Sequence, residues 1–230
     1  MKKKNLLLIL FVVLQKLYGA DIQITDKNLD VYLTPEYNRA YYFCWDISTV
    51  GSVNLNNRHT IKTGLALGAV GNNFDIKIFT AGETAPFVRI PLYFNLAYNY
   101  NGLPEFEYHN HSIPLMASLK WKWAGFSLGY NFRLSSFFGE PPVFEPVLLA
   151  SVYAYFINND FLQLGLKSAN FNDFTYGNLG AYFLNLNSVI RLNEKISLIN
   201  EIEIRQSGSI TLTSNFYGLV YRGGAAFIWQ

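Results

Sequence analysis

Residues 88–100 read VRIPLYFNLAYNY, and every second side chain in this stretch is large and apolar. The even positions carry Val, Ile, Leu, Phe, Leu, Tyr and Tyr, whereas the odd positions carry Arg89, Asn95 and Asn99 together with Pro, Tyr and Ala. Successive side chains of a β-strand point to opposite faces, so a period of two predicts a strand with one apolar and one polar face. Strands of soluble proteins usually have about 5 or 6 residues, and a tilted strand that crosses a bilayer needs about 9 to 11. The length of this stretch therefore favours a membrane-spanning strand.

Alternation of the same kind recurs along the chain, and no apolar run after residue 20 is long enough for a transmembrane helix. The expected strands are Tyr41–Val53, Thr60–Val70, Phe74–Thr80, Val88–Tyr100, Ile113–Trp123, Phe126–Phe137, Val147–Ile157, Phe161–Ala169, Leu179–Leu192, Lys195–Gln206 and Tyr217–Trp229. A further strand, Leu29–Thr34, is short, and Pro35 could end it. We therefore expect about twelve strands, with ten or eight as alternatives.

Composition distinguishes a barrel in lipid from a soluble sandwich. Charged residues make up 15% of the chain and aromatic residues 17%, whereas soluble domains carry about 25% charged residues. The polar faces are rich in Gly and Ala, as on Thr60–Val70, and small side chains suit a crowded barrel interior. Trp and Tyr near strand ends match the aromatic girdles of membrane barrels. The sequence thus predicts an all-β protein, a transmembrane antiparallel up-and-down β-barrel.

Residues 1–20 read as a secretory signal peptide. Three lysines precede the short apolar run Leu6–Leu14, and Gly19 and Ala20 precede Asp21. We expect cleavage after Ala20, which leaves residues 21–230 as a single domain. Removing the signal changes the count from 18 basic and 16 acidic residues to 14 and 16, so the basic character of the full chain does not indicate nucleic-acid binding.

The signal peptide, the repeated long hairpins and the last stretch, Tyr217–Trp229, resemble the outer-membrane β-barrel proteins of diderm bacteria. The resemblance is one of pattern, and no motif identifies one family. It implies an outer-membrane location, contact with outer-membrane lipid, and recognition of the last strand by the assembly machinery. In that class the last strand usually ends in an aromatic residue. Here Trp229 fits, but Gln230 follows it.

If the apolar face of each strand meets lipid, the opposite face lines the interior. The charged residues expected there are Lys62, Lys77, Arg89, Lys120, Lys122, Arg133, Lys167, Arg191, Arg205 and Arg222, with Asp75, Glu201 and Glu203 as the acidic members. This excess of cations predicts a narrow porin-like channel with a cationic lumen that favours small anionic solutes. The small porins for acidic oligosaccharides are similar in this respect. The other interpretation is a plugged barrel whose charges pair with one another.

The connections suggest a second function. Short turns at Ala124–Gly125, 158–160 and 193–194 alternate with longer loops, as bacterial barrels alternate periplasmic turns with external loops. The longer loops are Asn101–Ser112, Phe138–Pro146, Asn170–Asn178 and Ser207–Phe216. The alternative function is a barrel scaffold whose external loops act in adhesion, binding host or surface molecules.

A third possibility is a membrane-embedded lipid hydrolase, because Glu107, His109, His111 and Ser112 lie close together in sequence. In a strand, however, Ser112 points away from both histidines. The other three share a face and form a candidate metal-ligand set, although histidines without a metal are far commoner. We therefore expect no catalytic residue, no metal and no cofactor, and we expect Cys44 to be a buried, inert thiol.

Overall fold

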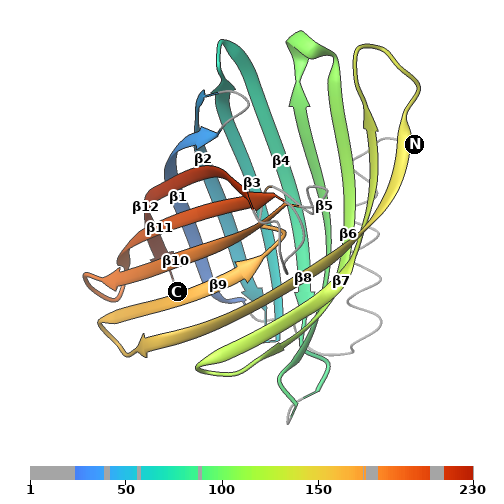
Figure 1. Ribbon diagram of the computed structural model, residues 1–230. Helices are drawn as coiled ribbons and strands as arrows, with labels where there is room; N and C mark the ends of the chain where they lie inside the picture. The colour runs from blue at the N-terminus through green and yellow to red at the C-terminus, as the bar shows by residue number, and fades with distance from the viewer. Residues whose placement is uncertain are drawn as a thin grey trace.

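The computed structural model describes residues 24–38, 42–55, 58–87, 90–172, 174, 181–207 and 215–229. These residues form a closed barrel in which each strand pairs antiparallel with its sequence neighbours and the first strand pairs with the last (Figure 1). The strands are β1 (Ile24–Asn38), β2 (Tyr42–Leu55), β3 (His59–Val70), β4 (Asn73–Thr84), β5 (Leu92–Leu103), β6 (Tyr108–Lys120), β7 (Ala124–Ser136), β8 (Val143–Asn158), β9 (Leu162–Ala169), β10 (Ala181–Arg191), β11 (Ile196–Ser207) and β12 (Asn215–Trp229). The predicted up-and-down barrel of twelve strands is confirmed. Among the residues described, no helix is long and apolar enough to cross a membrane.

The outer and inner surfaces have the polarity expected of a barrel in lipid. Leu96 and Leu115 point outward and are 56% and 52% exposed, whereas the inward-facing Asn99 and Asn131 are fully buried. A soluble domain buries its apolar side chains and exposes its polar ones. Here the exposed apolar side chains form a band on strand after strand, which requires a hydrocarbon environment. The predicted orientation of the two faces is therefore correct.

β1 is longer than the sequence pattern predicts. It runs from Ile24 to Asn38 and contains Pro35, which the sequence indicated as an end point. The pairing of β1 with β12 is interrupted between Leu33 and Glu36. The N–H that Pro35 lacks is therefore not required in this ladder, and the strand continues past it.

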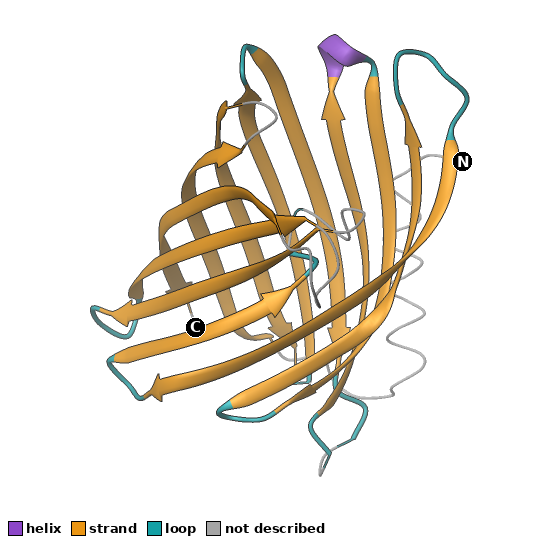
Figure 2. Ribbon diagram, in the orientation of Figure 1, coloured by secondary structure: helices purple, strands orange, loops and turns teal. Residues whose placement is uncertain are grey.

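Two predicted external loops, Asn101–Ser112 and Phe138–Pro146, are partly strand. β6 begins at Tyr108 and β8 begins at Val143, so the connections shrink to residues 104–107 and 137–142. The first of these is a short 3₁₀ turn, Pro104–Phe106, purple in Figure 2. The strands continue beyond the apolar band with their backbone hydrogen bonds intact. Outward residues there, such as His109, are polar, so the sequence no longer alternates between apolar and polar residues.

The turn predicted at Ala124–Gly125 is also displaced, because β7 already begins at Ala124 and the turn lies at residues 121–123. This turn and those at 159–161 and 192–195 lie at the end of the barrel where β1 begins and β12 ends, here called the C-terminal end. The opposite end, here called the distal end, carries residues 104–107 and 137–142.

Glycine on the inner face makes room for larger side chains of neighbouring strands. A Cβ atom on Gly64 would lie 2.2 Å from Cε1 of Phe79, and Phe79 is 1% exposed and packs against another buried ring. We expect Gly64→Ala to lower the free energy of unfolding by about 1–3 kcal/mol through overpacking. Urea unfolding in detergent micelles measures this loss of stability. Gly51→Ala is the control, since nothing lies within 4 Å of its added Cβ; an equal loss in both variants contradicts the packing explanation.

Candidate functional site

The chain turns into the barrel after β9. Asn170 fixes this turn against β8, because its Oδ1 accepts a hydrogen bond from the Ala150 amide at 3.0 Å and its Nδ2 donates to the Leu148 carbonyl at 2.7 Å. Phe171 and Phe174 follow and are 9% and 7% exposed. The predicted external loop Asn170–Asn178 is therefore wrong for residues 170–172 and 174. Its remaining residues lie outside the described part of the chain.

Phe171 and Phe174, here called the aromatic plug, lie in the lumen. The Phe174 ring packs edge-on against Phe79 of β4, with ring centroids 4.9 Å apart and an interplanar angle of 86°. Asn99 of β5 donates from Nδ2 to the Phe174 carbonyl oxygen at 2.8 Å. These two contacts attach Phe174 to β4 and β5, which are adjacent strands of the wall.

An apolar layer surrounds the aromatic plug inside an otherwise polar interior. Its wall residues are Val50, Ala66, Phe79, Ala81, Ala97, Met116 and Leu149, with Tyr32 packed against them. They come from β1 to β6 and β8, so the layer covers more than half of the circumference. Apolar constrictions of this kind resist the entry of water and ions. The layer therefore narrows the lumen around the aromatic plug.

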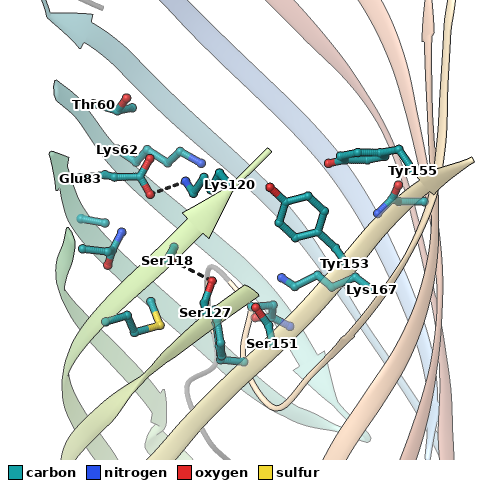
Figure 3. A pocket seen from close by; sticks show the side chains of 16 residues that line it. Thr60, Lys62, Glu83, Ser118, Lys120, Ser127, Ser151, Tyr153, Tyr155 and Lys167 are labelled. Atoms are coloured by element: carbon teal, nitrogen blue, oxygen red, sulfur yellow. Dashed lines mark hydrogen bonds and ion pairs between the residues drawn. The ribbon is translucent and has the colours of Figure 1, made fainter. Parts of the chain in front are cut away.

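A cavity of about 420 Å³ lies on one side of this layer. It is in the half of the barrel toward the C-terminal end, because it is lined by the first residues of β3 and β5 and by the last of β4, β6 and β8. Figure 3 shows side chains of these strands pointing into it. The lining residues are Thr60, Lys62, Ala81, Glu83, Asn95, Met116, Ser118, Lys120, Ser127, Ser151, Tyr153, Tyr155, Lys167, Phe171, Asn172 and Asn187.

The cavity carries more cations than carboxylates. Lys62, Lys120 and Lys167 line it together with one acidic residue, Glu83. Lys120 binds Glu83 across β5, with Nζ 2.5 Å from Oε2 (Figure 3). Lys167 lies beside the aromatic plug, with Nζ 5.2 Å from the centroid of the Phe171 ring. The local formal charge of these four side chains is positive.

Neutral polar groups complete the cavity. The Tyr153 and Tyr155 rings lie side by side, with centroids 5.3 Å apart, and both point into the cavity in Figure 3. Asn95 and Asn187 each bring an Oδ1 that accepts no hydrogen bond from any described residue. The tyrosine hydroxyl groups can bind hydroxyl and amino groups of a solute, whereas these two Oδ1 atoms are buried.

Two carboxylate–cation clusters occupy the interior nearer the distal end. Lys77 of β4 places Nζ 2.8 Å from Asp75 and 3.4 Å from Asp46 of β2. Arg205 of β11 binds Glu203 on its own strand at 2.7 Å, and it reaches over β12 to bind Glu36 of β1 at 2.5 Å. The second cluster therefore joins the two strands on either side of β12, next to the point where the barrel closes.

The interior carries more carboxylates than the sequence indicated. Among described residues on inward positions between the two rims, the acids are Asp30, Glu36, Asp46, Asp75, Glu83, Glu145, Glu201 and Glu203, and the bases are Lys62, Lys77, Lys120, Arg133, Lys167, Arg205 and Arg222. Glu83 and Glu145 lie in strand ends that the pattern assigned to loops. Arg222 binds Glu201 at 2.8 Å, and Arg133 binds Glu145. The expected ten-to-three excess of cations over carboxylates is therefore wrong.

Three predicted lumen residues lie elsewhere or outside the description. Lys122 is exposed in the turn after β6, with Nζ 5.6 Å from the Trp123 ring centroid, because β6 ends at Lys120. Arg191 is the last residue of β10 and is exposed at the rim. Arg89 lies outside the described residues.

The sequence cluster around His109 does not form one site. Ser112 faces the interior, 1% exposed. His109 and His111 face outward, and their Nδ1 atoms lie 2.9 and 2.8 Å from the hydroxyl groups of Tyr100 and Tyr98. Glu107 lies before β6 with a left-handed backbone, so it does not continue the histidine face of the strand.

Cys44 is 6% exposed on the inner face of β2, and the expectation of a buried thiol is confirmed.

No family model and no curated protein matches the amino-acid sequence. Solved structures match the fold. The KdgM porin, in a structure with a disordered oligogalacturonate, gives a TM-score of 0.59 at 8% identity, over 88% of this chain and 99% of that one. The NanC porin gives 0.58 at 10% identity, over 86% and 98%. The translocator domain of the autotransporter NalP from Neisseria meningitidis gives 0.53 at 12% identity, over 95% and 92%. This chain therefore has the fold of the small outer-membrane barrels, porins among them.

Proposed function

We propose that this protein is a narrow porin-like channel whose interior favours small anionic solutes. The observation that carries the proposal is the cavity beside the aromatic plug, where three lysines and one glutamate meet Tyr153, Tyr155 and amide groups. The fold alone does not determine the function, since a porin and an autotransporter translocator both match it.

The preference for anions is local to this cavity. Elsewhere in the described interior the cations Lys77, Arg133, Arg205 and Arg222 bind carboxylates, and such pairs present little net charge to a solute. The lining of the cavity itself carries three lysines, Lys62, Lys120 and Lys167, and one carboxylate, that of Glu83. The positive potential there attracts a carboxylate or another anionic group.

The size and polarity of the cavity limit the solute. A volume of about 420 Å³ lies at the lower end of the range of about 300–1,000 Å³ for small-molecule sites. Hydroxyl and amide groups around the lysines favour a hydroxylated acid over an apolar one. Oligogalacturonate is present in the KdgM structure, so short acidic sugars are the first solutes to test.

The proposal includes an outer-membrane location, cleavage of residues 1–20 and recognition of β12 by the assembly machinery. The apolar band on the outside of the barrel supports a membrane location. β12 ends with Phe227 and Trp229, whose ring centroids lie 6.5 Å apart, and an aromatic end of the last strand is the feature expected for assembly. The signal segment itself lies outside the described residues.

Ion selectivity in a planar bilayer tests the channel. Under a KCl gradient we expect a reversal potential that shows more permeability to chloride than to potassium. Replacing both Lys62 and Lys167 by Gln removes two positive charges from the cavity and shifts the potential toward that of a non-selective pore. Lys195→Gln is the matched control, because Lys195 is exposed in the turn after β10.

Two results contradict the proposal. One is cation preference in the unaltered protein. The other is the absence of ion current through folded protein even after the aromatic plug is removed. An unchanged reversal potential in the double variant refutes the assignment of selectivity to the cavity.

A further inference from the structure

Four aromatic side chains gather at the distal end, on the tips of the β5–β6 and β7–β8 hairpins. Phe106 lies 6.3 Å from Phe137 and 5.9 Å from Phe138 between ring centroids, Phe137 and Phe138 are 4.2 Å apart, and Tyr108 lies 6.2 Å from Phe137. Phe106, Tyr108, Phe137 and Phe138 are here called the aromatic tip. Figure 2 shows the two hairpin ends next to each other, with the 3₁₀ turn on one of them.

Hydrogen bonds hold the aromatic tip in place. The Phe138 amide donates to the Phe106 carbonyl at 3.1 Å and joins the two hairpins directly. Glu105 accepts a hydrogen bond from the Phe74 amide through Oε1 at 3.0 Å, which ties the 3₁₀ turn to the start of β4. Three neighbouring hairpins are thus connected, and the rings are arranged before any partner arrives.

The backbone conformation at position 138 is unfavourable for a phenylalanine. Phe138 has φ 50° and Gly139 has φ 70°, and the Glu140 amide donates to the Phe137 carbonyl at 3.0 Å. This is the geometry of a type I′ turn, in which Asn or Gly is preferred at the first central position. Phenylalanine is among the residues least suited to a positive φ. The turn therefore does not explain the aromatic residue at position 138.

Two rings of the aromatic tip are exposed, and the two connections that carry the tip also carry negative charge. Phe137 is 46% and Phe138 58% exposed. The carboxylates of Glu105, Glu107 and Glu140 are exposed beside them, and residues 104–107 and 137–142 contain no Lys or Arg. Acidic side chains do not favour the anionic surface of a membrane, whereas they complement a cationic protein surface.

We propose that the aromatic tip is a docking surface for a protein with an apolar patch rimmed by arginine or lysine. Rigid aromatic side chains at the centre of a contact supply most of the binding free energy of protein interfaces. Their fixed arrangement lowers the entropy lost on binding. The three glutamates favour a partner whose surface charge is positive. This role is independent of solute passage, because the aromatic tip lies outside the lumen.

A peptide probe tests this chemistry. The protein is reconstituted in phosphatidylcholine nanodiscs, and binding of a fluorescein-labelled peptide of alternating Leu and Arg is followed by fluorescence anisotropy. A peptide of alternating Leu and Glu is the charge control, and empty nanodiscs give the background. We expect the Leu-Arg peptide to bind at least tenfold more tightly than the Leu-Glu peptide.

Variants locate the binding. Phe138→Asn suits the left-handed turn better than Phe138 does, so the heat-unfolding temperature stays the same or rises while the Kd of the Leu-Arg peptide increases at least tenfold. Phe161→Asn, which removes a 65% exposed ring at the C-terminal end, leaves the Kd unchanged. Equal binding of both peptides, no binding of the Leu-Arg peptide, or an unaltered Kd in Phe138→Asn overturns the proposal.

Discussion

Replacing Phe174 by alanine is expected to raise the single-channel conductance several-fold. The Phe174 ring is almost completely buried inside the barrel and packs edge-on against Phe79 at 4.9 Å. Removing it leaves the wall strands intact but opens the apolar layer to water, and wetting of such a layer is what admits ions. Conductance in planar bilayers, measured in symmetrical KCl, gives the effect directly.

A second variant separates the ring from its attachment. Asn99→Ala removes the hydrogen bond that holds the Phe174 carbonyl but keeps the ring. We therefore expect the channel to open more often than the unaltered protein does, with a conductance no larger than that of Phe174→Ala. Phe161→Ala, at an exposed turn, controls for the loss of a phenylalanine. An unchanged conductance in folded Phe174→Ala protein means that ions do not pass where this ring lies.

Replacing Arg205 by methionine is expected to destabilise the barrel by about 3 kcal/mol, the scale seen when one partner of a buried ion pair is removed. Arg205 binds Glu203 and Glu36 at once, and the side chains of these acids are 4% and 15% exposed. Without the guanidinium group two carboxylates remain close together with little water. The midpoint of urea unfolding in detergent micelles measures the loss.

The double variant Arg205→Met with Glu203→Gln removes one of the two carboxylates and should recover part of the lost stability. Arg191→Met, at the exposed end of β10, changes stability little, because exposed charges contribute about 0–1 kcal/mol. If Arg205→Met and Arg191→Met cost the same, the cluster next to β12 does not stabilise barrel closure.

The barrel and its number of strands could be predicted because alternation is local. The stretch from Leu92 to Tyr100 shows in its own sequence that one face meets lipid, and the period of two fixes which residues face inward. That parity alone places Lys62, Lys120 and Lys167 on the inner face. Ends of strands are less predictable, because outward residues beyond the apolar band, such as His109, carry no hydrophobic signal.

The aromatic plug could not be predicted from the sequence. Residues 170–174 read NFNDF, which is a polar loop by composition, and nothing local shows that it turns inward. Its position depends on Phe79 and Asn99, which lie on strands formed far away in the chain. The same limit applies to the carboxylates, because Glu36 of β1 comes near Arg205 of β11 only when β12 pairs with both strands.

The apolar layer around the aromatic plug also affects how a voltage acts on this protein. Water-filled vestibules conduct ions and have a high dielectric constant, whereas a dry layer has neither property. In the channel proposed above, a potential difference between the two sides of the membrane would therefore fall mainly across the thickness of that layer. Lys167 lies next to Phe171, so in the channel proposed above an anion beside this lysine would cross most of the potential difference in one short step.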